Sequence, residues 1–131
     1  MFEGYARNKY VSTGVIQWML NNAWPSMIWH LYDYYLRPGG GYFGSKKANE
    51  PVHVQYSYDD RSIVVVNDLY EDFKNVRVSA EVFDMNLASR FSRDATIDVP
   101  ADGVVRALGI PALPGITTTY FLRLRLAHAD G

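Results

Sequence analysis

The sequence predicts a mainly β protein, in which an antiparallel β-sandwich over residues 51–131 follows a shorter mixed segment over residues 1–50. From Pro51 onward, apolar and polar residues alternate in several short runs separated by turn residues, a pattern typical of half-buried strands. Before Pro51 the chain instead has one continuous apolar run, Val15–Leu20, and an aromatic loop. A hydrophobic content of 48% is sufficient for a packed core.

The second segment contains the alternating runs. Strands are expected, in chain order, at residues 52–58, 63–66, 76–82, 95–99, 104–108 and 120–127. A tight turn is expected at Asp59-Asp60-Arg61, and Ala129-Asp130-Gly131 is typical of a hairpin turn. The alternation places His53 outward in solvent, and it places these side chains in the core: Val54, Val78, Val82, Leu122 and Leu124.

The first segment mixes helix and strand signals. One or two helical turns are expected within Phe2–Tyr10, and Val15–Leu20 is interpreted as a strand buried on both faces. After a break at residues 38–41, a further helical stretch is expected over Tyr42–Asn49, ending before Pro51. A single strand of this kind has no sheet of its own to join, so both ends of the chain are expected to be cut from something larger.

Composition excludes several classes of function. A net charge of -1 without a basic block argues against a nucleic-acid partner. The absence of cysteine excludes disulfides, thiolate catalysis and cysteine-based zinc sites, and the three histidines lack ligand spacing, so no metal and no cofactor are expected. No apolar run approaches the roughly 20 residues of a membrane span, so no membrane association is expected.

The most informative stretch is residues 14–35, GVIQWMLNNAWPSMIWHLYDYY, which holds all three tryptophans. Trp18 and Trp24 flank two adjacent amides, Asn21 and Asn22. Aromatic rings pack on the C–H face of a sugar, and amides hydrogen-bond its hydroxyl groups. The alternative is that these rings only fill a core, and for Trp29 this packing role is favoured.

These residues resemble the end of the catalytic barrel in glycoside hydrolase family 2, most closely its exo-β-D-glucosaminidase branch and next its β-mannosidases. The similarity lies in the spacing of Trp18, Asn21, Asn22, Trp24-Pro25 and Trp29, followed by Asp33-Tyr34-Tyr35 and Lys46-Lys47. The stretch VHVQYSYDDRSIVVVN after Pro51 resembles the Ig-like domain that follows that barrel.

The resemblance implies a specific fold and site. Residues 1–50 would be the C-terminal end of a truncated (β/α)8 barrel, namely its last strand, loop and helix, and residues 51–131 an Ig-like antiparallel β-sandwich, incomplete at its C-terminus. Since active sites of such barrels lie at the carboxyl ends of the strands, the implied substrate-binding residues are Trp18, Asn21, Asn22 and Trp24. The implied partners are an amino-sugar oligosaccharide and the missing remainder of the barrel.

The resemblance also implies that no catalytic residue is present. Retaining glycosidases need two carboxyl groups about 5 Å apart. In this family they are glutamates after the fourth and seventh strands, and this chain begins after the seventh. The implied protein is a retaining hydrolase of terminal β-glucosaminides, of which this chain is a fragment that is inactive by itself. The alternatives are a β-mannosidase fragment, a carbohydrate-binding β-sandwich and a structural Ig-like spacer.

Overall fold

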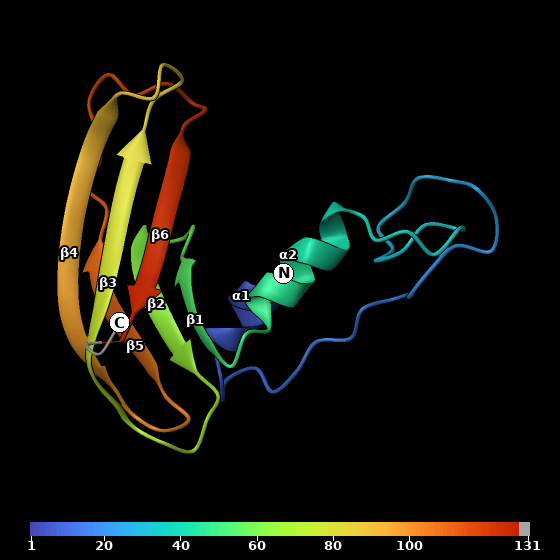
Figure 1. Ribbon diagram of the computed structural model, residues 1–131, viewed down its shortest axis with the longest axis horizontal. Helices are drawn as coiled ribbons and strands as arrows, with labels where there is room; N and C mark the ends of the chain where they lie inside the picture. Colours follow the sequence, from blue (N-terminus) through green and yellow to red (C-terminus); the bar gives the residue numbers. More distant parts are fainter. Residues whose placement is uncertain (129–131) are drawn as a thin grey trace. The chain divides into compact units, whose positions relative to one another are not determined.

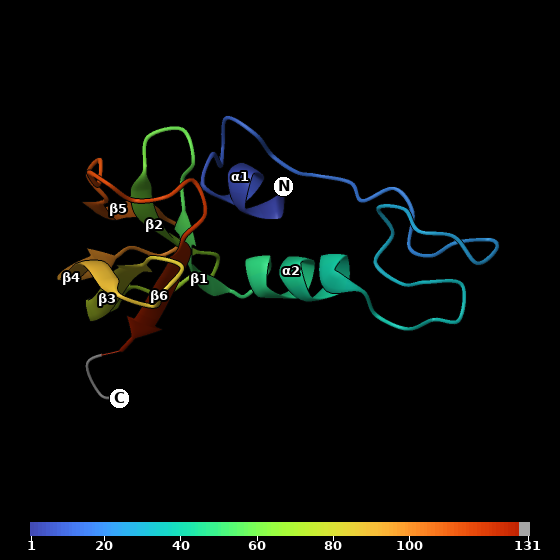
Figure 2. The same ribbon diagram turned by 90° about the horizontal axis from the view of Figure 1, so that it is seen from above.

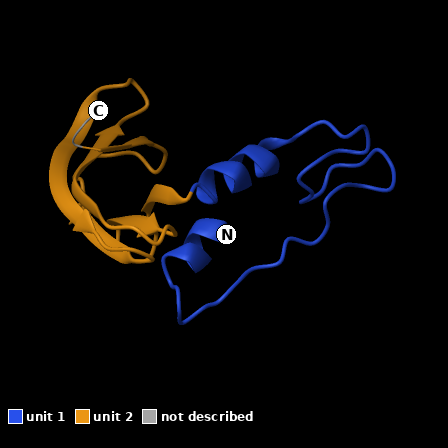
Figure 3. Ribbon diagram, turned by 60° about the horizontal axis from the view of Figure 1, so that its bottom comes forward, with its two compact units in different colours: residues 1–50 blue, residues 51–131 orange. Residues whose placement is uncertain are grey.

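The computed structural model describes residues 1–128 and divides the chain into two compact units, residues 1–50 and 51–131 (Figure 3). The division falls between Glu50 and Pro51, where the sequence changes from an irregular pattern to period-two alternation. Each unit is described separately below.

Unit 2 is a sandwich of two three-stranded antiparallel sheets (Figures 1 and 2). One sheet has the order β1-β2-β5, formed by β1 (Val52–Tyr56), β2 (Ser62–Asn67) and β5 (Val104–Gly109). The other has the order β4-β3-β6, formed by β4 (Ser89–Val99), β3 (Phe73–Phe83) and β6 (Phe121–Ala127). The predicted mainly β antiparallel architecture is therefore confirmed.

The core lies between the two sheets and follows the alternation in the sequence. On β3, every second residue from Val76 to Val82 is buried. The fully or nearly fully buried core side chains are Ile63, Val65, Val76, Val78, Ala80, Val82, Val99, Leu108 and Ile110. Of the predicted core residues, Val78 and Val82 are fully buried, whereas Val54, Leu122 and Leu124 are partly buried against the same cluster.

Two details of unit 2 differ from the sequence prediction. His53 was expected in solvent but is only 4% exposed, because the face of β1 that carries His53 and Gln55 is buried as well. Strands β3 and β4 are longer than predicted, because their unpredicted stretches hold charged residues that interrupt the apolar alternation. These residues form ion pairs across the two strands: Lys74 of β3 pairs with Asp98, and Asp94 of β4 pairs with Arg77. The predicted turn at Ala129–Gly131 lies outside the described residues.

Unit 1 contains two helices, α1 (Phe2–Ala6) and α2 (Gly40–Ala48), joined by a long irregular segment. Both helices were predicted, and the five residues of α1 fit the one or two helical turns expected within Phe2–Tyr10. The predicted strand Val15–Leu20 is wrong in this structure: the segment forms no strand, and Ile16 and Leu20 are 87% and 59% exposed. A strand needs a neighbour to satisfy its backbone groups, and the described residues of unit 1 form single bridges but no sheet.

A tyrosine pair in the sandwich predicts how stability depends on alkaline pH. Burial, followed by a hydrogen bond with Tyr120, raises the pKa of Tyr56 to about 12. An unfolded tyrosine ionises with a pKa of about 10. The contribution of Tyr56 to stability is therefore fully present below pH 10 and is lost as the pH rises toward 12, because the unfolded state releases its proton first.

We expect the Tyr56→Phe variant to lose less stability than the wild type between about pH 10 and 12. Urea unfolding of unit 2 measured across this range checks the prediction. Tyr70, which is 90% exposed, provides the control through Tyr70→Phe, and equal alkaline losses in both variants would contradict the assignment.

Candidate functional site

The residues predicted to bind sugar lie in one irregular segment of unit 1, here named the aromatic loop, residues 18–33. Trp18 and Trp24 are each 70% exposed. Within residues 1–128, neither indole makes a ring contact with another aromatic side chain. Exposed large apolar side chains on one segment mark it as an interaction surface.

Backbone hydrogen bonds hold the two ends of the aromatic loop together. The Tyr32 amide donates to the Leu20 carbonyl at 3.0 Å, and Asn21 and Tyr32 form a parallel bridge. Tyr32 also bridges to Pro38, and the Gly39 amide donates to the Leu31 carbonyl at 3.0 Å. The loop is therefore closed at its base although no sheet supports it.

The two adjacent asparagines have different environments. Asn22 is only 7% exposed, and its side-chain amide donates to the Ser26 carbonyl at 2.8 Å, which closes the turn containing Trp24-Pro25. Asn21 is less deeply buried, and its amide lies 3.2 Å from the Asn22 carbonyl. The structure thus brings Asn21, Asn22 and Trp24 into one loop, with Asn22 facing inward.

The acidic residue at the end of the loop is committed to an ion pair. The Asp33 carboxylate accepts hydrogen bonds from the backbone amide and the Nε of Arg37, both at 2.9 Å. The backbone hydrogen bond from Arg37 is the largest cause that lowers the pKa of Asp33 below its usual value. A carboxylate held ionised in this way is a poor proton donor.

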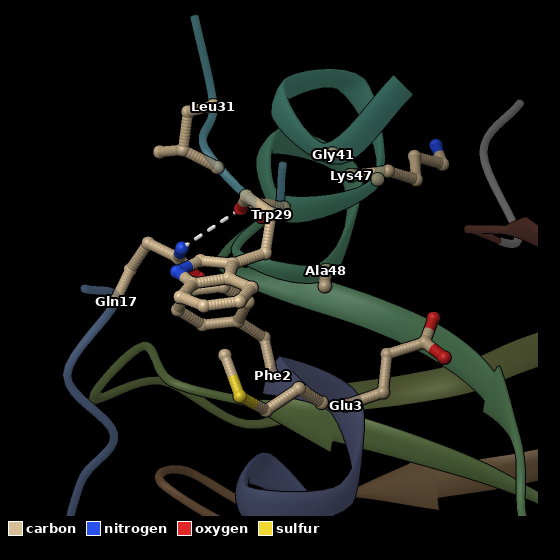
Figure 4. Close-up of a pocket in the computed structure, with 11 residues that line it drawn as sticks. Phe2, Glu3, Gln17, Trp29, Leu31, Gly41, Lys47 and Ala48 are labelled. Atoms are coloured by element: carbon tan, nitrogen blue, oxygen red, sulfur yellow. Dashed lines mark hydrogen bonds between the residues drawn. The ribbon is translucent and has the colours of Figure 1, made fainter. Parts of the chain in front are cut away.

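A cavity of about 440 Å³ lies between α1, α2 and the segments at residues 17 and 29–31 (Figure 4). The Trp29 side chain lines it together with Phe2, Ala48 and Gln17. A neighbouring cavity of about 400 Å³ is lined by Asn22, His30 and other residues from the loop and from the glycine segment 39–41. Trp29 is nevertheless 66% exposed in this chain, and its packing role stays a prediction.

Sequence reasoning missed the role of Gln17, the single polar side chain inside the apolar run Val15–Leu20. Its Nε2 donates to the Trp29 carbonyl at 3.1 Å and to the Trp18 carbonyl at 3.3 Å. The sequence did indicate a role for Gln17, because a polar residue within an apolar run must find hydrogen-bond partners if it is partly buried. The interpretation of Val15–Leu20 as a barrel strand left this hydrogen-bonding role of Gln17 unrecognised.

The described part of the chain holds no group of three or more His, Cys, Asp or Glu side chains that could bind a metal ion. None of its helices is both long and apolar enough to cross a membrane.

Comparison with known proteins identifies close relatives of this chain. It is 44% identical to an exo-β-D-glucosaminidase of Streptomyces avermitilis, over 99% of this chain and 15% of that protein, and 38% identical to the one from Amycolatopsis orientalis, over 99% and 13%. It is also 31% identical, over 66% of its length, to a mannosylglycoprotein endo-β-mannosidase of Lilium longiflorum, covering 9% of that protein. No family model matches the chain.

A solved structure agrees with these relatives. The crystal structure of the Amycolatopsis orientalis exo-chitosanase CsxA, a glycoside hydrolase family 2 enzyme, matches with a TM-score of 0.90 at 36% identity, over 99% of this chain and 16% of that one. The chain thus spans about 15% of the length of the relatives it matches. It belongs to the exo-β-D-glucosaminidase branch of glycoside hydrolase family 2 and corresponds to one segment of those longer proteins.

Proposed function

We propose that this chain supplies part of the sugar subsite of a retaining glycoside hydrolase that acts on terminal β-glucosaminides, such as chitosan oligosaccharides, together with an Ig-like accessory domain. In this proposal, residues 1–50 are the C-terminal end of the catalytic barrel, and the remainder of the barrel is the partner of unit 1. Both catalytic carboxyl groups come from that remainder.

The observation that carries the proposal is the pair of exposed indoles, Trp18 and Trp24, in the same segment as Asn21. Trp18 and Trp24 are mostly exposed and lack aromatic partners in the described chain, on a loop closed by hydrogen bonds at its base. An isolated solvent-exposed indole costs hydration free energy unless a ligand or partner covers it. Relatives support a sugar as that ligand, since a CsxA variant has been crystallised with PNP-β-D-glucosamine.

We assign different roles to the two asparagines. Asn21, which is the less buried, contacts the sugar hydroxyl groups, whereas Asn22 holds the turn that presents Trp24 through its bond to Ser26. A direct contact that strengthens in the transition state affects turnover as well as binding. A residue that closes a turn instead affects the order of the loop.

The test is to replace each asparagine with Ala in the full-length protein that carries this chain. We expect Asn21→Ala to lower kcat/KM for an aryl β-glucosaminide by roughly tenfold, about 1.4 kcal/mol. Asn22→Ala should in addition reduce the protection of the loop amides against hydrogen exchange. The same assay with an aryl β-mannoside distinguishes a glucosaminidase from a mannosidase, and wild-type kcat/KM in Asn21→Ala would remove Asn21 from the site.

A further inference from the structure

We infer that Gln17 is a positioning residue, whose side chain sets the aromatic loop in the geometry that presents Trp18 and Trp24 to substrate. This inference rests on the proposed function, because it takes the aromatic loop as a substrate-binding element. Gln17 itself contacts backbone atoms of the loop, so it acts on substrate only through the residues that it holds.

The first support is the match between donors and acceptors. A glutamine side-chain amide has two N–H donors. The structure places two backbone carbonyl oxygens within reach of the Gln17 Nε2, that of Trp18 at 3.3 Å and that of Trp29 at 3.1 Å. Figure 4 shows the bond to Trp29, which joins residue 17 to a residue twelve positions further along the chain.

The second support is the position of this contact in the loop. The Tyr32 amide and the Leu20 carbonyl close the loop through the backbone, and Gln17 adds a side-chain link from the residue before the loop to Trp29 within it. In this chain Val15–Leu20 pairs with no strand, so the Gln17 side chain adds a link that the backbone of this run does not provide. Trp18 is the next residue in the chain, so its backbone is fixed directly.

Two variants of nearly the same size separate hydrogen bonding from packing. Gln17→Met keeps the length of the side chain in the cavity but removes both donors. Gln17→Glu keeps the shape but, when ionised, places acceptor oxygens against the two carbonyl oxygens. Protonation of the new carboxyl group at low pH restores one donor, whereas Gln17→Met gains nothing. Glu3, Lys47 and the α-amino group of Met1 are the charged groups lining the same cavity, so each variant is compared with wild type at the same pH.

The first measurement uses the 131-residue chain and follows hydrogen exchange at the Tyr32 amide by NMR, since this amide reports closure of the loop base. Near pH 7 we expect its protection factor to fall at least about fivefold in both variants. Near pH 4 we expect Gln17→Glu to recover toward wild type and Gln17→Met not to recover. Equal protection in wild type and both variants at both pH values would overturn the inference.

The second measurement is kcat/KM of the full-length protein for an aryl β-glucosaminide. We expect a loss of at least about fivefold in both variants near pH 7, and a smaller loss relative to wild type for Gln17→Glu at low pH. If Trp18→Ala lowers kcat/KM but neither Gln17 variant does, the positioning role is wrong and the proposed function stands. If neither Trp18→Ala nor Asn21→Ala has an effect, the proposed function itself fails, whatever hydrogen exchange shows for Gln17.

Discussion

Replacement of Asn67 with Ala is expected to lower the free energy of unfolding of unit 2 by about 3–5 kcal/mol. Asn67 ends β2 and is fully buried. Its Nδ2 donates to the Glu71 carbonyl at 2.8 Å and to the Pro100 carbonyl at 2.9 Å, while its Oδ1 accepts from the Leu69 amide at 2.9 Å. One side chain thus joins the end of β2 to the loop before β3 and to the turn after β4.

The large expected cost arises because Ala leaves several buried backbone groups without their partner, each at about 1–3 kcal/mol before relaxation. Chemical denaturation followed at the amide signals of β2 and β3 measures the change. Asn86→Ala is the matched control, since Asn86 is exposed in the turn between β3 and β4 and its loss should cost less than about 0.5 kcal/mol. A loss below about 1 kcal/mol for Asn67→Ala would show that other groups or water satisfy these carbonyls.

The largest functional effect is expected at Trp18. In the full-length protein that carries this chain, Trp18→Ala should lower kcat/KM for an aryl β-glucosaminide by about 10- to 100-fold, or roughly 1.4–2.8 kcal/mol. Where the purified variant folds as the wild type does, its loss of kcat/KM reflects lost substrate contact rather than lost packing. A stacking ring that favours the distorted sugar of the transition state affects kcat as well as KM.

Trp29 supplies the control for this prediction. Its side chain is exposed to nearly the same extent, 66%, but lines the cavity beside Phe2 and α2. Under the packing role, Trp29→Ala lowers the yield and stability of the protein while the folded fraction keeps its kcat/KM. If Trp18→Ala also lowers yield and stability while the folded fraction keeps its kcat/KM, the two tryptophans share a packing role and Trp18 is not part of the proposed site.

Local periodicity was sufficient to predict the sandwich. Val76, Val78, Ala80 and Val82 face the core because successive side chains of a strand point to opposite faces, and this rule needs no knowledge of the rest of the fold. The same reasoning located β6, and the break before the helix together with the stop at Pro51 located α2, each to within a few residues. It placed His53 wrongly because alternation identifies one buried face but says nothing about whether the opposite face is also covered.

Features that depend on distant contacts could not be predicted in this way. The run Val15–Leu20 has the composition of a buried strand, but whether it pairs depends on neighbours that the pattern does not specify. The bond of Gln17 to Trp29 and that of Asn67 to Pro100 each join residues far apart in sequence. In the candidate site, residue types identified the tryptophans and asparagines, but the inward orientation of Asn22 became apparent only with its bond to Ser26.

The most direct test is a crystal structure of the full-length protein with a β-glucosaminide bound. The proposal predicts that the C–H face of the terminal sugar lies within about 4 Å of the Trp18 or Trp24 ring, with a hydroxyl group in hydrogen-bond distance of the Asn21 side chain. A sugar bound in the active site with Trp18, Asn21 and Trp24 all out of contact would contradict it and would make the aromatic loop part of the scaffold.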